Sequence, residues 1–190
     1  MSGSHFAEAF RRRSALATRT AEDAELLERF AQRFVATLKG GGTLFFAGNG
    51  GSAADAQHIA TEYVVRYKSD RRAMAAIALT TDTSLLTAAG NDLGFEKLFS
   101  RQVEALCRKG DLLVLHSTSG NSPNLLEAAK AAKAKGVAVV ALLGKDGGPL
   151  KALVDEAYVV RSDVGSDIQE THLAIEHLIV EVVEAALVVR

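Results

Sequence analysis

His58 and Glu62, two side chains able to transfer protons, follow a glycine-rich turn in the first third of the chain. The turn Gly48-Asn49-Gly50-Gly51-Ser52 lies between an apolar run and an Ala-rich stretch that favours a helix. Glycines let a ligand approach the backbone, and the free N–H groups of a helix's first turn favour an anion. Since His58 and Glu62 are four positions apart, they share one helix face, a turn below the anion site. This spacing is also typical of a solvated surface pair, but its place behind a ligand loop indicates an enzyme.

A second polar loop, Ser117-Thr118-Ser119-Gly120-Asn121-Ser122-Pro123, comes between an apolar run and another helical stretch. Ser122 is a suitable helix N-cap and Pro123 a suitable first helical residue. Four hydroxyls around one glycine exceed what capping requires, and with the helix N-terminus they could surround a phosphate monoester. An ordinary Ser/Thr turn is the alternative, which the density of hydroxyls makes less favoured.

The spacing Gly48-x-Gly50-x-x-Ala53 also matches the dinucleotide-binding pattern G-x-G-x-x-G/A. That pattern requires an acidic residue about 20 positions later. Asp82 follows the second predicted strand but comes some thirty residues after the turn. A dinucleotide-binding oxidoreductase therefore remains a minor alternative, which a titration showing no NAD(P) binding would remove.

The composition excludes several classes of protein. The 190 residues include 48% hydrophobic and 24% charged side chains, which is typical of one globular domain. A net charge of −1 gives no electrostatic footprint for nucleic acid or a membrane surface. The only cysteine is Cys107, so no disulfide can form within the chain. No membrane-spanning run or signal peptide is present, and we expect a cytoplasmic protein.

The elements that must position these loops alternate between strand and helix. Apolar runs predict strands at residues 43–47, 75–79, 111–116, 137–143 and 157–160. Helical patterns cover residues 52–66, 84–89, 95–108, 123–135, 149–153 and 167–188, with two more helices in residues 6–39. Alternating elements with near-continuous apolar strands predict a doubly wound parallel sheet covered on both faces. We expect one domain over residues 1–190, with a helical region at 1–40 and an α/β core with the last helix at 41–190.

The last predicted helix, residues 167–188, is apolar on more sides than one sheet requires. A helix of this kind is usually buried on most sides, and association of subunits would supply the second surface. The sequence therefore predicts a homo-oligomer, in which the terminal helices mediate association. A concentration-independent monomer in sedimentation would contradict it.

The two loops and their order resemble the sugar isomerase (SIS) domain, a flavodoxin-like doubly wound fold, and more specifically the phosphoheptose isomerase family. Six motifs carry the resemblance from about residue 20 to the C-terminus. They are Gly48-Asn49-Gly50-Gly51-Ser52, the His58/Glu62 pair, Gly90-Asn91-Asp92, the loop from Ser117 to Ser122, Gly144-Lys145-Asp146-Gly147-Gly148, and Ile168-Gln169-Glu170.

This resemblance implies aldose–ketose isomerisation of D-sedoheptulose 7-phosphate to D-glycero-D-manno-heptose 7-phosphate, the first step of activated heptose biosynthesis. It also implies a homotetramer with active sites shared between subunits and one zinc ion per subunit. By position, the zinc ligands are His58, Glu62, Gln169 and His177. The substrate contacts are Asn49, Gly50, Gly51, Ser52, Glu62, Asn91, Asp92, Ser117, Thr118, Ser119, Ser122 and Gln169.

Moving a carbonyl between C1 and C2 requires a base, an acid and stabilisation of an enediolate. Glu62 is a suitable base if it is partly buried, and His177 can shuttle the second proton because histidine titrates near neutral pH. Gln169 and His177 are about 80° apart around a helix, so they share a broad face that could meet His58 and Glu62. A carboxylate bound to zinc is a weaker base, and whether Glu62 must leave the metal to act stays open.

Other polar residues of the chain have less definite interpretations. We expect His172, Glu170 and Glu176 to be solvated or at an interface, whereas His116 either lines the pocket or lies in the core. Ser166-Asp167 and His116 depart from the pattern of many relatives, which places the substrate detail in question more than the fold.

A non-catalytic scaffold is the main alternative function, because the DnaA initiator-associating proteins resemble most of the same chain. A scaffold has no need for His58, Glu62, Gln169 and His177 together, so catalysis is favoured. Capture of a replication initiator by a protein without isomerase activity would favour the scaffold.

Overall fold

The computed structural model describes residues 4–187 and contains five strands and nine helical segments within them. The elements run in the order α1 (Ser4–Glu22), α2 (Ala24–Lys39), β1 (Leu44–Gly48), α3 (Gly51–Val64), β2 (Ala76–Ala78), α4 (Thr83–Asp92), η1 (Phe95–Lys97), α5 (Ser100–Leu106), β3 (Leu112–Ser117), α6 (Pro123–Ala134), β4 (Ala138–Gly144), η2 (Pro149–Ala152), β5 (Glu156–Val160) and α7 (Gly165–Leu187). No helix in this range is long and apolar enough to cross a membrane.

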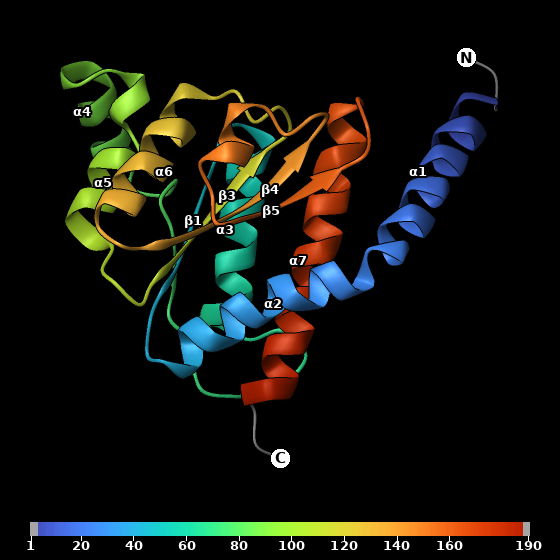
Figure 1. The fold of residues 1–190 in the computed structure, drawn as a ribbon, viewed down its shortest axis with the longest axis horizontal. Helices are drawn as coiled ribbons and strands as arrows, with labels where there is room; N and C mark the ends of the chain where they lie inside the picture. Colours follow the sequence, from blue (N-terminus) through green and yellow to red (C-terminus); the bar gives the residue numbers. More distant parts are fainter. Residues whose placement is uncertain (1–3, 188–190) are drawn as a thin grey trace.

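The strands form one parallel sheet in the order β2-β1-β3-β4-β5. Figure 1 labels four of them, β1, β3, β4 and β5. Every residue of β1 and β3 is buried, which explains the apolar runs of residues 44–47 and 112–115. The two strands run side by side in register from the pair Leu44 and Leu112 to the pair Gly48 and His116. Both loops that carry the ligand motifs therefore leave the sheet at the same end, where the parallel strands have their carboxyl ends.

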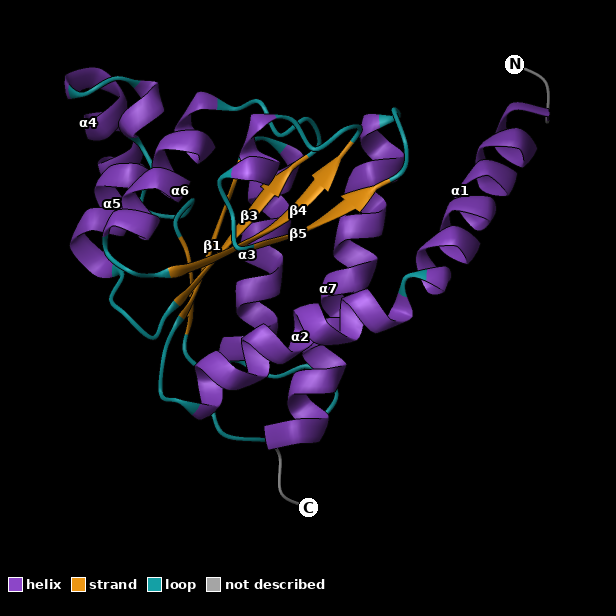
Figure 2. Cartoon of the chain, viewed as in Figure 1, coloured by secondary structure: helices purple, strands orange, loops and turns teal. Residues whose placement is uncertain are grey.

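Helices cover both faces of the sheet, as Figure 2 shows. Alternate strand residues such as Phe46 and Val114 pack with α2, α3 and α7 in one core. Their neighbours Phe45 and Leu113 pack with α5 and α6 in the other. The predicted doubly wound α/β fold is confirmed.

The order of the strands reverses between β1 and β3. From β1 the chain passes outward to β2, and from β3 it proceeds in the opposite direction to β4 and β5. Doubly wound sheets bind ligands at such a switch point, beyond the carboxyl ends of the strands. The loops at residues 48–52 and 117–122 lie on either side of it.

Helix α1 extends away from the rest of the molecule (Figure 1). Leu16 is its one buried side chain, whereas Phe6 is 70% exposed and Phe10 is 68% exposed. It is joined to α7 by Arg12, whose Nε donates to Asp167 Oδ2 at 2.5 Å, and by Arg13, which pairs with Glu170. Arg13 also pairs with Asp167, so the buried carboxylate of Asp167 is neutralised by two arginines of α1.

Most predicted elements are confirmed, with two differences in the region before β3. The helix expected at residues 95–108 divides into η1 and α5, and Gly90-Asn91-Asp92 forms the last turn of α4 instead of a loop after it. Gly90 carries no positive φ, so the helix continues through it. Helix α7 extends to Leu187, and the expected end at Val188 lies outside the described residues.

Arg71 and Glu184 form a buried ion pair that secures the segment between α3 and β2. Arg71 Nε donates to Glu184 Oε1 at 2.8 Å, and its two terminal nitrogens donate to the carbonyls of Glu62 and Tyr63 at 2.6 and 2.8 Å. Glu184 also accepts from the backbone N–H groups of residues 67–69. The pair therefore holds the C-terminal end of α3, which carries Glu62, against α7.

We expect Glu184→Gln to lower the free energy of unfolding by about 1.5–3 kcal/mol at pH 7, because hydrogen bonds to a buried charge are lost. Burial alone raises the pKa of Glu184, but its bonds to Arg71 and to the backbone of Tyr67 and Lys68 outweigh it, and the folded-state pKa is lowered. Its contribution is therefore present above the ordinary glutamate pKa and is lost as the pH falls through the folded pKa. Urea unfolding at pH 7 and in acid measures both effects.

Glu181→Gln is the matched control, since Glu181 lies on the same helix in an exposed pair with Lys68. Exposed ion pairs contribute little, so this variant should unfold like the wild type. Equal losses for the two variants, or a Glu184 effect that grows in acid, would contradict the assignment.

Candidate active site

His58 and Glu62 on α3 lie close to His177 on α7, where these two helices pack against each other. His58 Nε2 lies 2.9 Å from His177 Nε2 and 3.5 Å from Glu62 Oε1. One nitrogen or oxygen of each residue lies within 4.8 Å of the other two. The His58 side chain is 46% exposed and that of Glu62 17%, so the group opens to solvent on one side. Three residues from distant parts of the chain thus form one polar cluster.

The ring of Tyr67 lies flat against His177, with centroids 5.5 Å apart and planes 14° from parallel. The rings of His58 and His177 meet edge to face at 5.1 Å. These contacts fix the plane of the His177 imidazole. Sequence patterns gave no signal for Tyr67, because it lies in the irregular segment after α3.

The cluster has the chemistry of a metal site. Zinc bonds to imidazole are about 2.0–2.1 Å long, so two nitrogens on one tetrahedral zinc lie roughly 3.3 Å apart. The observed 2.9 Å between His58 Nε2 and His177 Nε2 is close to this spacing. Two imidazoles and a carboxylate are ligands that zinc accepts. His58, Glu62 and His177 therefore form a group able to hold a metal ion.

Gln169 lies two turns before His177 on α7, beside the glycine-rich turn. Its Nε2 donates to Asp55 Oδ1 at 3.1 Å, and a Cβ on Gly51 would overlap its amide. The hydrogen bond thus holds Gln169 against the N-terminal part of α3. Glycine at position 51 is explained by this close approach of α7.

The turn at residues 48–52 is held by an amide pair. Asn49 Nδ2 donates to Asn124 Oδ1 at 2.9 Å, and Asn124 Nδ2 donates back to Asn49 Oδ1 at 2.8 Å. Asn124 is buried in the first turn of α6, so this pair connects the two ligand loops. Asn124 was missed from the sequence because its partner is 75 residues away. Gly50 is exposed and Ser52 is buried at the start of α3.

The hydroxyls of the second loop fall into two groups. Ser117 Oγ accepts from Gly120 N at 2.9 Å, and Ser119 Oγ accepts from Asn121 N at 3.3 Å. Ser122 occupies the N-cap position of α6 but makes no side-chain capping bond. Thr118 likewise has no side-chain hydrogen bond within residues 4–187. Two hydroxyls thus shape the loop and two remain available to a ligand.

Gly120 permits the close packing of this loop. Its φ is +65°, and a Cβ would overlap the carbonyl oxygen of Gly147. The turn at residues 144–148, one of the six sequence motifs, therefore packs directly behind the hydroxyl loop.

Asn91 and Asp92 lie apart from this cluster in the described chain. Both are exposed in the last turn of α4, where Asn91 Nδ2 donates to Asp92 Oδ1 at 2.7 Å. No hydrogen bond found in residues 4–187 joins them to either ligand loop.

The sequence profile of the SIS domain family matches residues 5–144. The chain belongs to the SIS domain family. It is 52% identical over 158 residues to a phosphoheptose isomerase of Akkermansia muciniphila. The matched region covers 83% of this chain and 84% of the relative. A phosphoheptose isomerase of a Bradyrhizobium species is also 52% identical, over 172 residues that cover 89% and 87% of the two chains.

Two solved structures of phosphoheptose isomerases superpose closely on this chain. A phosphoheptose isomerase from Neisseria gonorrhoeae superposes with a TM-score of 0.91 at 40% identity, covering 96% of this chain and 98% of its own. One from Francisella tularensis gives a TM-score of 0.93 at 32% identity, with coverages of 97% and 100%. The predicted resemblance to phosphoheptose isomerases is confirmed.

Two polar residues of this SIS domain differ from their expected environment, and two others lie in one that was expected. His172 and Glu176, expected to be solvated or at an interface, are almost fully buried, while Glu170 is exposed as expected. His116 is a core residue, with no exposed surface. Helix α7 packs against the sheet, so its face at residues 168, 172 and 176 points inward although two of these positions are polar. Burial lowers the pKa of His172 to about 4, against the effect of its bond to the carbonyl of Leu143.

Proposed function

We propose that this protein is a phosphoheptose isomerase, which converts D-sedoheptulose 7-phosphate to D-glycero-D-manno-heptose 7-phosphate as the first step of activated heptose biosynthesis. The observation that carries the proposal is the convergence of His58, Glu62 and His177 at 2.9 and 3.5 Å. Its support is the identity of about half with curated phosphoheptose isomerases. An intramolecular redox isomerisation needs groups that move protons, and this cluster provides them.

Proton transfer is assigned to Glu62 and His177. Glu62 takes the proton from the carbon beside the substrate carbonyl, and His177 exchanges the second proton with the substrate oxygens. Arg71 holds the backbone under Glu62, and Tyr67 fixes the plane of the His177 ring. Both groups are thus attached to rigid helices, which keeps them oriented toward the enediolate.

The substrate is assigned to the two loops at the switch point. Thr118 and Ser122 offer hydroxyls to the phosphate, beside the N-terminus of α6. The turn at residues 48–52 forms the wall for the sugar chain. The full set proposed for substrate contact is Asn49, Gly50, Gly51, Ser52, Glu62, Asn91, Asp92, Ser117, Thr118, Ser119, Ser122 and Gln169.

The metal assigned to the cluster is zinc, held by His58, Glu62 and His177 with Gln169 as a fourth, weaker ligand. Gln169 bonds to Asp55, so its amide would have to turn to join the set. When bound, zinc supplies Lewis-acid polarisation of the substrate oxygens.

A homotetramer with active sites at subunit interfaces is part of the proposal. A groove of about 540 Å³ between α1, α2 and α7 is lined mainly by apolar side chains, and Leu178 within it is 59% exposed. Asn91 and Asp92, remote from the cluster of their own chain, could then serve a neighbouring subunit. Residues 1–190 are proposed as one SIS domain, and the cytoplasmic location remains a prediction.

The decisive experiment is incubation of the purified protein with sedoheptulose 7-phosphate, followed by NMR, with zinc and with a chelator. Appearance of the heptose 7-phosphate supports the proposal. No conversion under either condition, together with capture of a replication initiator, would replace it with the scaffold alternative.

Ser122→Ala tests the phosphate assignment. We expect the KM for sedoheptulose 7-phosphate to rise about tenfold, the usual effect of losing one hydrogen bond to a charged group. Because Ser122 makes no capping bond, the free energy of unfolding should change by less than about 0.5 kcal/mol. Steady-state kinetics and urea unfolding measure the two quantities.

Asp82→Ala is the matched control, since Asp82 caps α4 by accepting from Leu85 N at 3.0 Å. Loss of this cap should cost about 1 kcal/mol with an unchanged KM. An unchanged KM for Ser122→Ala would refute its contact with the phosphate.

A further inference from the structure

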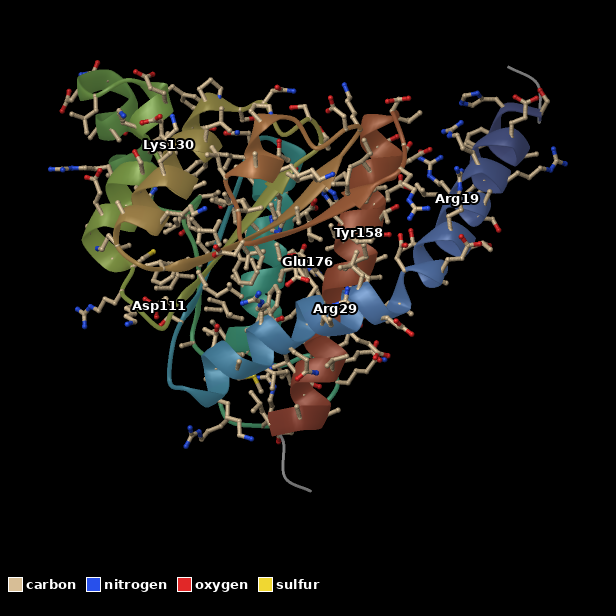
Figure 3. The ribbon with its side chains drawn as sticks, viewed as in Figure 1. Arg19, Arg29, Asp111, Lys130, Tyr158 and Glu176 are labelled. Carbon is tan, nitrogen blue, oxygen red and sulfur yellow. The ribbon has the colours of Figure 1, made fainter. Side chains whose placement is uncertain are left out.

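A buried polar pair crosses the core between β3 and α7, the elements that carry Ser117 and His177. His116 Nε2 donates to Glu176 Oε1 at 2.7 Å, and the two side chains are 0% and 1% exposed. Figure 3 shows Glu176 between α7 and α3. Aromatic rings lie beside it: the His116 ring stacks on Phe46 with centroids 6.1 Å apart, and Phe46 stacks on Tyr63 at 5.9 Å. The pair therefore joins β3 to α7 through the interior.

Unsatisfied polar atoms concentrate around this pair. Within residues 4–187, the buried side-chain atoms without a hydrogen-bond partner are Asp55 Oδ2, Tyr63 OH, His116 Nδ1, His172 Nδ1 and Glu176 Oε2. Two belong to the pair, and the other three side chains interact electrostatically with one of its members. Such groups are rare in folded proteins and each requires an explanation.

Both ends of the pair adjoin residues assigned to the reaction. His116 immediately precedes Ser117 and lies opposite Gly48 in the sheet, where both ligand loops begin. Glu176 immediately precedes His177 on α7. The hydrogen bond therefore connects the origin of the substrate loops to the helix turn that carries the proposed acid–base group.

Stability does not explain the pair. Replacing a buried ion pair by apolar side chains of similar volume is often neutral or stabilising, whereas removing one partner is destabilising. Burial by itself lowers the pKa of His116, but the charge and hydrogen bond of Glu176, with Asp55 and the Ser52 backbone, raise it above the ordinary value. A directional hydrogen bond at this point instead fixes how α7 lies against the sheet.

We propose that His116 and Glu176 are positioning residues, which set the place of His177 relative to the two substrate loops. Apolar packing is non-directional, so it leaves a helix free to adopt slightly different positions against a sheet. One short hydrogen bond in the interior removes that freedom. Displacements of about 1 Å at a reacting group can cost a factor of 100 in rate, so the pair is matched to this task.

The test compares His116→Leu, Glu176→Leu and the double variant. Each single variant leaves a polar partner buried and should melt at a lower temperature, whereas the double variant should recover most of the loss. The positioning role predicts that the recovered double variant still shows a kcat at least tenfold below the wild type, with a KM within threefold. A double variant with a kcat within twofold of the wild type overturns the proposal.

Glu176→Gln provides a second test of the positioning role if the double variant fails to fold. Glutamine can still accept from His116 Nε2, so its kcat should stay within about threefold of the wild type, while Glu176→Leu loses more than tenfold. Equal kcat values for these two variants overturn the proposal. Arg33→Gln with Glu156→Gln is the control, because this exposed pair also joins a helix to the sheet and should leave kcat unchanged.

This inference rests on the proposed function, and a second measurement separates their failures. Wild-type protein without isomerase activity refutes the function alone. Zinc titration of the apoprotein then tests positioning, since His58 and His177 must stay aligned to bind the metal. The double Leu variant should bind zinc at least tenfold more weakly than the wild type, and equal affinities overturn the positioning role.

Discussion

Glu62→Gln is expected to lower kcat for sedoheptulose 7-phosphate by about 10²–10⁴-fold, the range of general acid–base catalysis. Glutamine has nearly the same shape but accepts no proton at neutral pH. Glu62 is partly buried, and its backbone carbonyl is held by Arg71 at 2.6 Å. The substitution therefore removes the base without moving the helix. NMR time courses at saturating substrate measure kcat, and circular dichroism follows the fold.

Glu104→Gln is the control for this experiment, since Glu104 is exposed on α5, across the sheet from α3. The same chemical change there should leave kcat at the wild-type value. A Glu62→Gln variant that retains more than a tenth of the wild-type kcat would exclude Glu62 as the base. A loss of kcat accompanied by unfolding would point to a structural role instead.

His177 and His58 should respond differently to substitution, although both belong to the metal group. We expect His177→Gln and His58→Gln to weaken zinc binding to a similar degree, because each contributes one ring nitrogen. With zinc added to saturation, His177→Gln should still lose about 10²–10⁴-fold in kcat, because the second proton carrier is gone. His58→Gln should recover to within about tenfold of the wild type. Zinc titration and kinetics at saturating zinc separate the two effects.

His5→Gln is the matched control, because this histidine lies on α1 outside the cluster. It should leave both the zinc affinity and kcat unchanged. If the two cluster variants recover equally at saturating zinc, His177 acts as a ligand alone and the second proton must have another carrier.

Local sequence was enough to predict the layers of the fold and the two loops. Continuous apolar runs such as that of β3 can be stable only when both faces of a strand are covered, so they specify a parallel sheet between helices. Gly120 and Pro123 marked the hydroxyl loop, because glycine permits a positive φ whereas proline fixes φ and lacks an N–H donor. The separation of four residues between His58 and Glu62 placed them on one helix face before any tertiary contact was known.

Distant pairings were beyond these local signals. Asn49 and Asn124 are 75 residues apart, and neither position carries a periodic pattern that names its partner. Tyr67 and Arg71 lie in an irregular segment whose role depends on α7, more than 100 residues later. Their functions follow from side chains that only the folded chain brings together.

Helix α7 shows which features of this protein follow from its sequence and which follow only from its tertiary structure. The sequence by itself determined a doubly wound α/β chain with two ligand loops and a polar set that includes His177, because residue type and spacing fix local geometry. His172 and Glu176 look like solvated positions, since glutamate is almost never fully buried and histidine is so less often than apolar residues. Only the packing of α7 on the sheet placed them inside, where Glu176 meets His116 at 2.7 Å. A helix's buried side is set by its partners, and a short-range pattern does not contain that information.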